Sequence, residues 1–127
     1  MIIYASRTGN VRYIASKISV ESIEISEELK LNKPYLLITY TDGLGDIPAK
    51  VDRFLKQNRE FCKGVVVSGN SNFGHAVFGG AGDKIAATYH IPLVYKLDLR
   101  GYQADYEAIQ EFYEKRVIRD ENISKAE

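Results

Sequence analysis

Residues 1–18 read MIIYASRTGNVRYIASKI: an apolar run, then a polar loop with one glycine, then a segment of helical periodicity. The apolar run at 1–5 predicts a strand. From residue 10 onward, apolar side chains recur at Val11, Ile14, Ala15 and Ile18, which is the spacing of one helix face. A strand that passes through a short loop into a helix is the repeating unit of α/β folds with a parallel sheet.

The same alternation continues along the chain. The run at 35–40 and its later counterpart at 65–67 are continuously apolar, as in strands covered on both faces, whereas 20–26 alternates as an edge strand does. Strands are predicted at 1–5, 20–26, 35–40, 63–69 and 91–99, and helices at 10–18, 48–61, 81–90 and 103–116. We therefore expect an α/β fold: a flavodoxin-like, doubly wound, five-stranded parallel sheet in the order 2-1-3-4-5, with helices on both faces.

Length and composition narrow the class of protein. A chain of 127 residues fits one domain, which we expect at 1–117, with a flexible tail at 118–127. The 17 basic and 17 acidic residues cancel, so we expect neither a nucleic-acid nor a membrane partner. The single cysteine, Cys62, cannot form an internal disulfide, and no signal peptide is evident, so we expect a cytoplasmic protein.

The predicted strand order also predicts where a ligand binds. In doubly wound sheets, ligands bind at the carboxyl ends of the strands, near the point where the strand order reverses. The loops after the first, third and fourth strands should meet there. They read SRTGN (6–10), TDGLGD (41–46) and GNSNFGHAVFGGAGD (69–83), which are the most polar and glycine-rich stretches of the chain.

The first loop has the composition of an anion-binding loop. Hydroxyls, an amide, a glycine turn and the free N–H groups of a helix start can together hold a phosphate. The alternative is that these side chains only cap the helix. The loop has no lysine of a P-loop, no G-x-G-x-x-G and no cysteine nucleophile. Its candidate phosphate-binding residues are Ser6, Arg7, Thr8, Gly9, Asn10 and Val11.

Beyond this loop, the chain resembles the NrdI family, which consists of flavodoxin-like FMN proteins of class Ib ribonucleotide reductase systems. The stretches that carry the resemblance are SRTGNVRYI (6–14), PYLLITYTDGLGDIPAKVDRFL (34–55), VVVSGNSNFG (65–74), AGDKIA (81–86) and IPLVYKLDLRG (91–101). The resemblance implies noncovalently bound FMN, a partner named NrdF, which is the small subunit of the reductase, and an unidentified reductant. In that family, reduced FMN reacts with O2, and the superoxide-type oxidant reaches the dimanganese site of NrdF, where a tyrosyl radical forms.

With FMN implied, the two other loops gain predicted roles. Backbone groups of Gly43, Leu44 and Gly45 would lie near flavin N5, and no residue of the chain would be catalytic itself. The alternatives are a simple glycine turn for the second loop and a core position for Phe73. The further candidate contacts are Thr41, Asp42, Gly43, Leu44, Gly45, Ser68, Gly69, Asn70, Asn72, Phe73, Gly74, Phe78 and Gly79.

A histidine and three aspartates near these loops are not assigned a role in metal binding. His75 is interpreted as an exposed loop histidine, and Asp42, Asp46 and Asp83 have no spacing that demands a metal, so no metal site is expected. Two alternative functions stay open. A generic flavodoxin would share the FMN site but act as a low-potential electron carrier, and a flavin-free binding module would use the loops only as helix caps.

Overall fold

The structure is a computed structural model that describes residues 1–74 and 77–119. The strands are β1 (Ile2–Tyr4), β2 (Ser22–Glu24), β3 (Tyr35–Tyr40), β4 (Cys62–Gly69) and β5 (Leu93–Asp98). The helices are α1 (Asn10–Ser16), α2 (Ala49–Asn58), α3 (Gly80–Tyr89) and α4 (Gln103–Phe112). Two short 3-10 helices, η1 (Arg59–Phe61) and η2 (Ser71–Phe73), and a π-helical segment, η3 (Tyr113–Ile118), complete the described elements.

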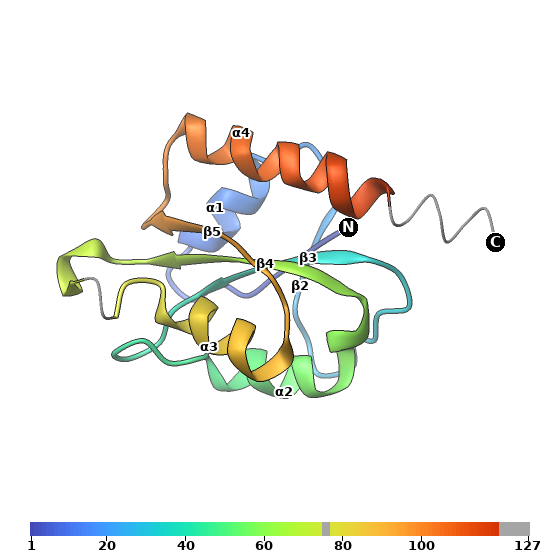
Figure 1. The fold of residues 1–127 in the computed structure, drawn as a ribbon, viewed down its shortest axis with the longest axis horizontal. Coiled ribbons are helices and arrows are strands. Elements are labelled where there is room, and N and C mark those ends of the chain that lie inside the picture. Colours follow the sequence, from blue (N-terminus) through green and yellow to red (C-terminus); the bar gives the residue numbers. More distant parts are fainter. Residues whose placement is uncertain (75–76, 120–127) are drawn as a thin grey trace.

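The five strands form one parallel sheet in the order β2-β1-β3-β4-β5, which confirms the predicted topology. Helices α1 and α4 cover one face of the sheet, and α2 and α3 cover the other (Figure 1). The chain reverses its direction of travel across the sheet after β2, so the loops that follow β1 and β3 lie on either side of the switch point.

Alternating side chains of the strands divide the core into two layers. Ile2, Leu36, Ile38 and Val66 pack with α1 and α4, whose buried residues include Ile14 and Ile109. Their neighbours along the strands, Ile3, Leu37 and Val65, pack with α2 and α3 on the opposite face. Since side chains of a strand point alternately to its two faces, continuously apolar strands are what a sheet covered on both sides requires.

The edge position of β2 follows from its sequence. Ile23 is half-buried and pairs with Ile3, while the flanking Ser22 and Glu24 are exposed. Next to the sheet centre, β4 is almost wholly buried, and its first residue is Cys62. Burial raises the pKa of the Cys62 thiol to about 11, so the thiol stays protonated and has little nucleophilic character near neutral pH.

The predicted elements are of the right type, and the differences lie at their ends. The helix predicted at 48–61 ends as the 3-10 turn η1, and the one predicted at 103–116 widens into η3 and continues through Ile118. The first two residues predicted as tail, 118–119, therefore carry helical backbone, and residues 120–127 lie outside the described residues. None of the described helices is long and apolar enough to cross a membrane.

Candidate functional site

A cleft of ≈ 530 Å³ opens at the carboxyl ends of the central strands. This volume is within the range of small-molecule and cofactor sites. The loops after β1, β3 and β4 contribute most of its wall, as the topology predicts. Its lining residues are Arg7, Thr8, Asn10, Tyr40, Thr41, Asp42, Gly43, Ser68, Gly69, Asn70, Phe73, Val77 and Leu99.

In the loop after β1, one hydroxyl is bound to the start of helix α1 and another lines the cleft. The Ser6 hydroxyl accepts a hydrogen bond from the backbone N–H of Arg12 at 3.3 Å, so Ser6 satisfies one of the free N–H groups in the first turn of α1, whose N-cap residue is Gly9. Gly9 has a φ of 95°, a left-handed conformation in which glycine is favoured, and it turns the chain into the helix. The Thr8 hydroxyl, which lines the cleft, makes no hydrogen bond within the described residues. Capping therefore accounts for Ser6 but leaves Thr8 available to a ligand.

The loop after β3 is a tight, hairpin-like turn. Asp42 and Asp46 form an antiparallel bridge, and the N–H groups of Gly45 and Asp46 both donate to the Asp42 carbonyl, at 3.1 Å and 2.7 Å. Gly43 and Gly45 have φ values of 48° and 101°. Helix α3 begins directly against this turn, because a Cβ added to Gly80 would lie 2.8 Å from the Gly45 Cα. The turn is thus set by its own backbone and by a glycine of the neighbouring helix.

Both carboxylates of this turn are paired with cations from other elements. Arg7 Nη1 lies 2.7 Å from Asp42 Oδ1, and Lys84 Nζ lies 2.6 Å from Asp46 Oδ1. The Arg7 guanidinium also lies over the Tyr40 ring, 5.0 Å from its centroid. Burial, followed by the nearby Asp42 charge, raises the pKa of Tyr40, and Arg7 opposes that shift. At neutral pH, then, Tyr40 is a neutral phenol in the cleft wall.

The loop after β4 is tied to the end of β5. The Ser71 backbone N–H and hydroxyl both donate to the Asp98 carboxylate, at 3.0 Å and 2.7 Å. These bonds, the backbone one first, lower the pKa of Asp98. Asn70 Oδ1 accepts from the Asn72 N–H at 2.9 Å and so begins the turn η2. The turn presents Phe73 to the cleft with 63% of its surface exposed, which excludes the core alternative for that ring.

A fourth loop, after β5, completes the wall and was not predicted from the sequence. Leu99 has a φ of 56°, which is uncommon for a residue other than glycine. Two hydrogen bonds hold it there: the Leu99 N–H donates to the Gly69 carbonyl at 2.8 Å, and the Ser68 hydroxyl donates to the Leu99 carbonyl at 2.5 Å. Its side chain lies 46% exposed at the cleft. Tyr40 and Val77 are the other lining residues that sequence reasoning missed.

Several predicted residues do not line the cleft. Val11 packs its side chain in the core, which leaves only its backbone for a ligand, and Phe78 lies under Lys96, whose Nζ is 6.0 Å from the ring centroid. Leu44 is 73% exposed and does not line the cleft. His75 lies outside the described residues. The predicted residues outside the lining are Ser6, Gly9, Val11, Leu44, Gly45, Asn72, Gly74, Phe78 and Gly79.

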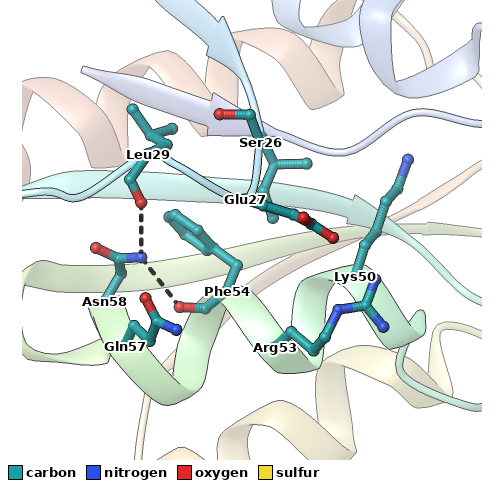
Figure 2. A pocket seen from close by; sticks show the side chains of 9 residues that line it. Ser26, Glu27, Leu29, Lys50, Arg53, Phe54, Gln57 and Asn58 are labelled. Carbon is teal, nitrogen blue, oxygen red and sulfur yellow. Dashed lines mark hydrogen bonds between the residues drawn. The ribbon is translucent and has the colours of Figure 1, made fainter.

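A second cavity, of ≈ 550 Å³, lies between residues 25–29 and α2 (Figure 2). Phe54 occupies its middle, with Lys50 and Arg53 at one end and Asn58 at the other (Figure 2). The Asn58 amide is fully used within the fold: its Nδ2 donates to the Leu29 and Phe54 carbonyls, and its Oδ1 accepts from the Leu31 N–H. No predicted site residue lies in this cavity. Among the described residues, no cluster of three or more His, Cys, Asp or Glu side chains could hold a metal ion.

Comparisons with known proteins agree with this architecture. The family model described as NrdI Flavodoxin like matches residues 2–111. Protein NrdI of Deinococcus radiodurans is 40% identical over 114 residues, covering 86% of this chain and 79% of that protein. Protein NrdI of Macrococcus caseolyticus is 34% identical over 127 residues, covering 94% and 98%. The SPbeta prophage-derived protein NrdI of Bacillus subtilis is 38% identical over 110 residues, covering 84% of each chain.

Among solved structures, a short-chain flavodoxin associated with a PDU bacterial microcompartment has a similar fold. Its TM-score is 0.65 at 20% sequence identity, and the match covers 93% of this chain and 95% of that one. At this level of identity the likeness supports the flavodoxin-like fold and nothing finer.

Proposed function

The chain belongs to the NrdI flavodoxin-like family, and we propose that it binds FMN noncovalently in the cleft and serves NrdF, the small subunit of a class Ib ribonucleotide reductase. When bound and reduced, FMN supplies the electrons that convert O2 into the superoxide-type oxidant from which the dimanganese site of NrdF assembles its tyrosyl radical. The observation that carries the proposal is that residues predicted for FMN from three separate loops line one cleft in a chain of this family.

The phosphate end of FMN fits the loop after β1. Thr8 and Asn10 present a hydroxyl and an amide to the cleft, and hydrogen bonds to a charged acceptor are stronger than those between neutral groups. Arg7 adds a guanidinium at the same wall. Ser6 is engaged by the helix start, so it is the weakest of the predicted phosphate contacts.

The ring system of FMN fits the part of the cleft lined by the loops after β3, β4 and β5. Gly43, Gly69 and Asn70 bring backbone groups and an amide to the wall, which a flavin needs for the polar edge of its ring system. The exposed side chains of Phe73 and Leu99 offer contact for its apolar faces. The lining therefore combines polar donors suited to a phosphate with polar and apolar groups suited to a flavin ring.

Charge pairing on the 41–46 turn favours a reduced flavin. Unpaired carboxylates close to the ring would disfavour the negative charge that a fully reduced flavin carries. Here Asp42 is paired with Arg7 and Asp46 with Lys84. These four residues together contribute no net charge, in a chain whose formal net charge is also zero. That arrangement suits a protein whose fully reduced cofactor meets O2, and we place it in the cytoplasm, with its reductant unidentified.

The flavodoxin-like fold leaves open a second candidate function, that of a generic flavodoxin acting as a low-potential electron carrier. Both candidates predict that FMN turns the protein yellow, whereas a flavin-free binding module would stay colourless when FMN is added. The two candidates differ in how the reduced protein behaves: the carrier passes electrons to an acceptor protein, reacts slowly with O2 and has no effect on NrdF.

The deciding experiment combines the reduced FMN-loaded protein with manganese-loaded NrdF and O2, and measures tyrosyl radical by electron paramagnetic resonance. We expect radical in proportion to added protein, up to one equivalent. The control lacks this protein but contains free reduced FMN at the same concentration. An amount of tyrosyl radical no higher than in that control would contradict the NrdF role and favour the electron carrier as the function of this protein.

A further inference from the structure

Arg100, in the loop after β5, is held more firmly than an exposed arginine ordinarily is. The Tyr106 hydroxyl of α4 donates to the Arg100 carbonyl at 2.5 Å. The preceding residue, Leu99, is fixed by hydrogen bonds to Ser68 and Gly69 at the end of β4. The backbone of Arg100 is therefore anchored from both sides, and its side chain leaves the loop in a defined direction.

The side chain of Arg100 reaches the first loop of the cleft. Its Nε donates to Asn10 Oδ1 at 3.1 Å, and its guanidinium carbon lies 4.7 Å from the centroid of the Tyr13 ring. Tyr13 is itself packed edge-on against Tyr106, with ring centroids 6.4 Å apart. Stacking on an aromatic ring restrains a guanidinium at little cost to its remaining hydrogen bonds.

This contact determines which end of the Asn10 amide faces a ligand. The bond from Arg100 holds Oδ1 toward the guanidinium, and the Nδ2 group, which can only donate, is the part of the amide that a phosphate acceptor can use. Arg100 uses only Nε in this bond, and its other N–H groups have no acceptor within residues 1–74 and 77–119. Arg7, by contrast, is already paired with Asp42. Asn10 and Arg100 together thus present donors and one unpaired positive charge beside the loop at 6–10.

We propose that Arg100 is a positioning and specificity residue for the phosphate group of the flavin: it orients Asn10 to donate, and its charge distinguishes FMN from riboflavin, which lacks the phosphate. The inference rests on the proposed FMN function and adds to it a residue that does not line the cleft. Its side chain acts on the phosphate end alone, so it should not affect how the ring system is held.

The test is the affinity of the R100Q variant for two ligands, FMN and riboflavin, measured by quenching of flavin fluorescence. Glutamine keeps a donor of reduced reach and removes the charge. We expect the Kd for FMN to rise about tenfold, since one charge-assisted hydrogen bond is involved, and the Kd for riboflavin to stay within about twofold. The difference in FMN affinity between R100Q and the wild type should decrease as the salt concentration is raised, because salt screens the attraction between Arg100 and the phosphate.

Two further variants separate orientation from general structure. R116Q is the matched control, because Arg116 also lies over an aromatic ring, 6.0 Å from the Phe112 centroid. Arg116 belongs to η3, which follows the C-terminal end of α4, whereas Arg100 precedes the N-terminal end of that helix. We expect wild-type affinity from R116Q for both ligands. In an N10A background, R100Q should raise the Kd for FMN by clearly less than about tenfold, because part of the effect of Arg100 acts through Asn10.

Equal weakening of FMN and riboflavin by R100Q, or no change for either, would overturn the role of Arg100 while leaving FMN binding by the wild-type protein intact. Absence of FMN binding by the wild-type protein would instead overturn the proposed function, and the role of Arg100 with it.

Discussion

Replacing Gly80 with alanine should disturb the turn that is predicted to face flavin N5. The added Cβ would lie 2.8 Å from the Gly45 Cα and 2.9 Å from its carbonyl oxygen. Both are backbone atoms, so no side chain can rotate away, and the turn or the helix must move by at least 0.6 Å to restore the 3.4 Å of an ordinary contact. The φ of Gly80 is not positive, so alanine meets no backbone strain of its own.

The magnitude is set by two opposing effects. Overpacking of this kind costs about 1–3 kcal/mol, and the better helix propensity of alanine returns up to about 1 kcal/mol. We expect G80A to lower the free energy of unfolding by about 1–2 kcal/mol in urea denaturation. Displacement of the 41–46 turn should also weaken FMN binding about fivefold, which corresponds to the loss of one neutral hydrogen bond.

A glycine two residues further along α3 provides the control. A Cβ on Gly82 would lie 2.7 Å from Leu93 Cδ1 and 2.8 Å from Val67 Cγ1, which are side-chain atoms of the core and not part of the turn. G82A should therefore lose stability but keep its FMN affinity. Wild-type stability and FMN affinity in G80A, or FMN binding weakened as much in G82A as in G80A, would contradict a role of Gly80 in setting the turn.

Three other predictions concern the loops that form and support the cleft. The T8A/N10A double variant should weaken FMN binding by about 1 kcal/mol or more per lost bond, and an unchanged fluorescence titration would place the phosphate elsewhere. F73A should weaken FMN and riboflavin binding alike, by about 1 kcal/mol, with the unfolding midpoint unchanged, because the ring is exposed. The hydrogen bonds from Ser71 lower the pKa of Asp98, so they should persist at pH values above 3.8, the ordinary pKa of an aspartate, and weaken only when the pH falls below that value. The Ser71 amide resonance reports this titration, and a midpoint at or above pH 3.8 would contradict the prediction.

The fold could be predicted from the sequence because local pattern and global topology agree. Continuous apolar runs specify strands buried on both faces, and the alternation around Ile23 specifies the edge. The features that the pattern missed depend on distant partners. The turn η2 is tied to the end of β5 because Ser71 donates to the Asp98 carboxylate 27 residues away, and the amphipathic pattern of α4 continues into the π-helical segment without a change of period.

The position of the site could be predicted from the sequence, but not all of its lining residues could. The rule that ligands meet the carboxyl ends of strands identified three loops, and the same rule applied to the fifth strand would have added Leu99. Its left-handed backbone carries no sequence signal, because leucine rarely adopts it and the bonds from Ser68 and Gly69 impose it. Phe73 could be core or exposed on composition alone, since hydrophobicity does not distinguish a core ring from a ligand-facing one.

We propose that FMN binds in the cleft and not in the similar-sized cavity around Phe54 shown in Figure 2. The most direct measurement is a titration of the 15N-labelled protein with FMN, monitored through the backbone amide resonances. We predict saturation at one equivalent, with the large shifts confined to residues 6–10, 40–46, 68–74 and 97–101. Large shifts at 25–29 and 50–58 with an unperturbed cleft, or no shifts at all, would contradict this claim.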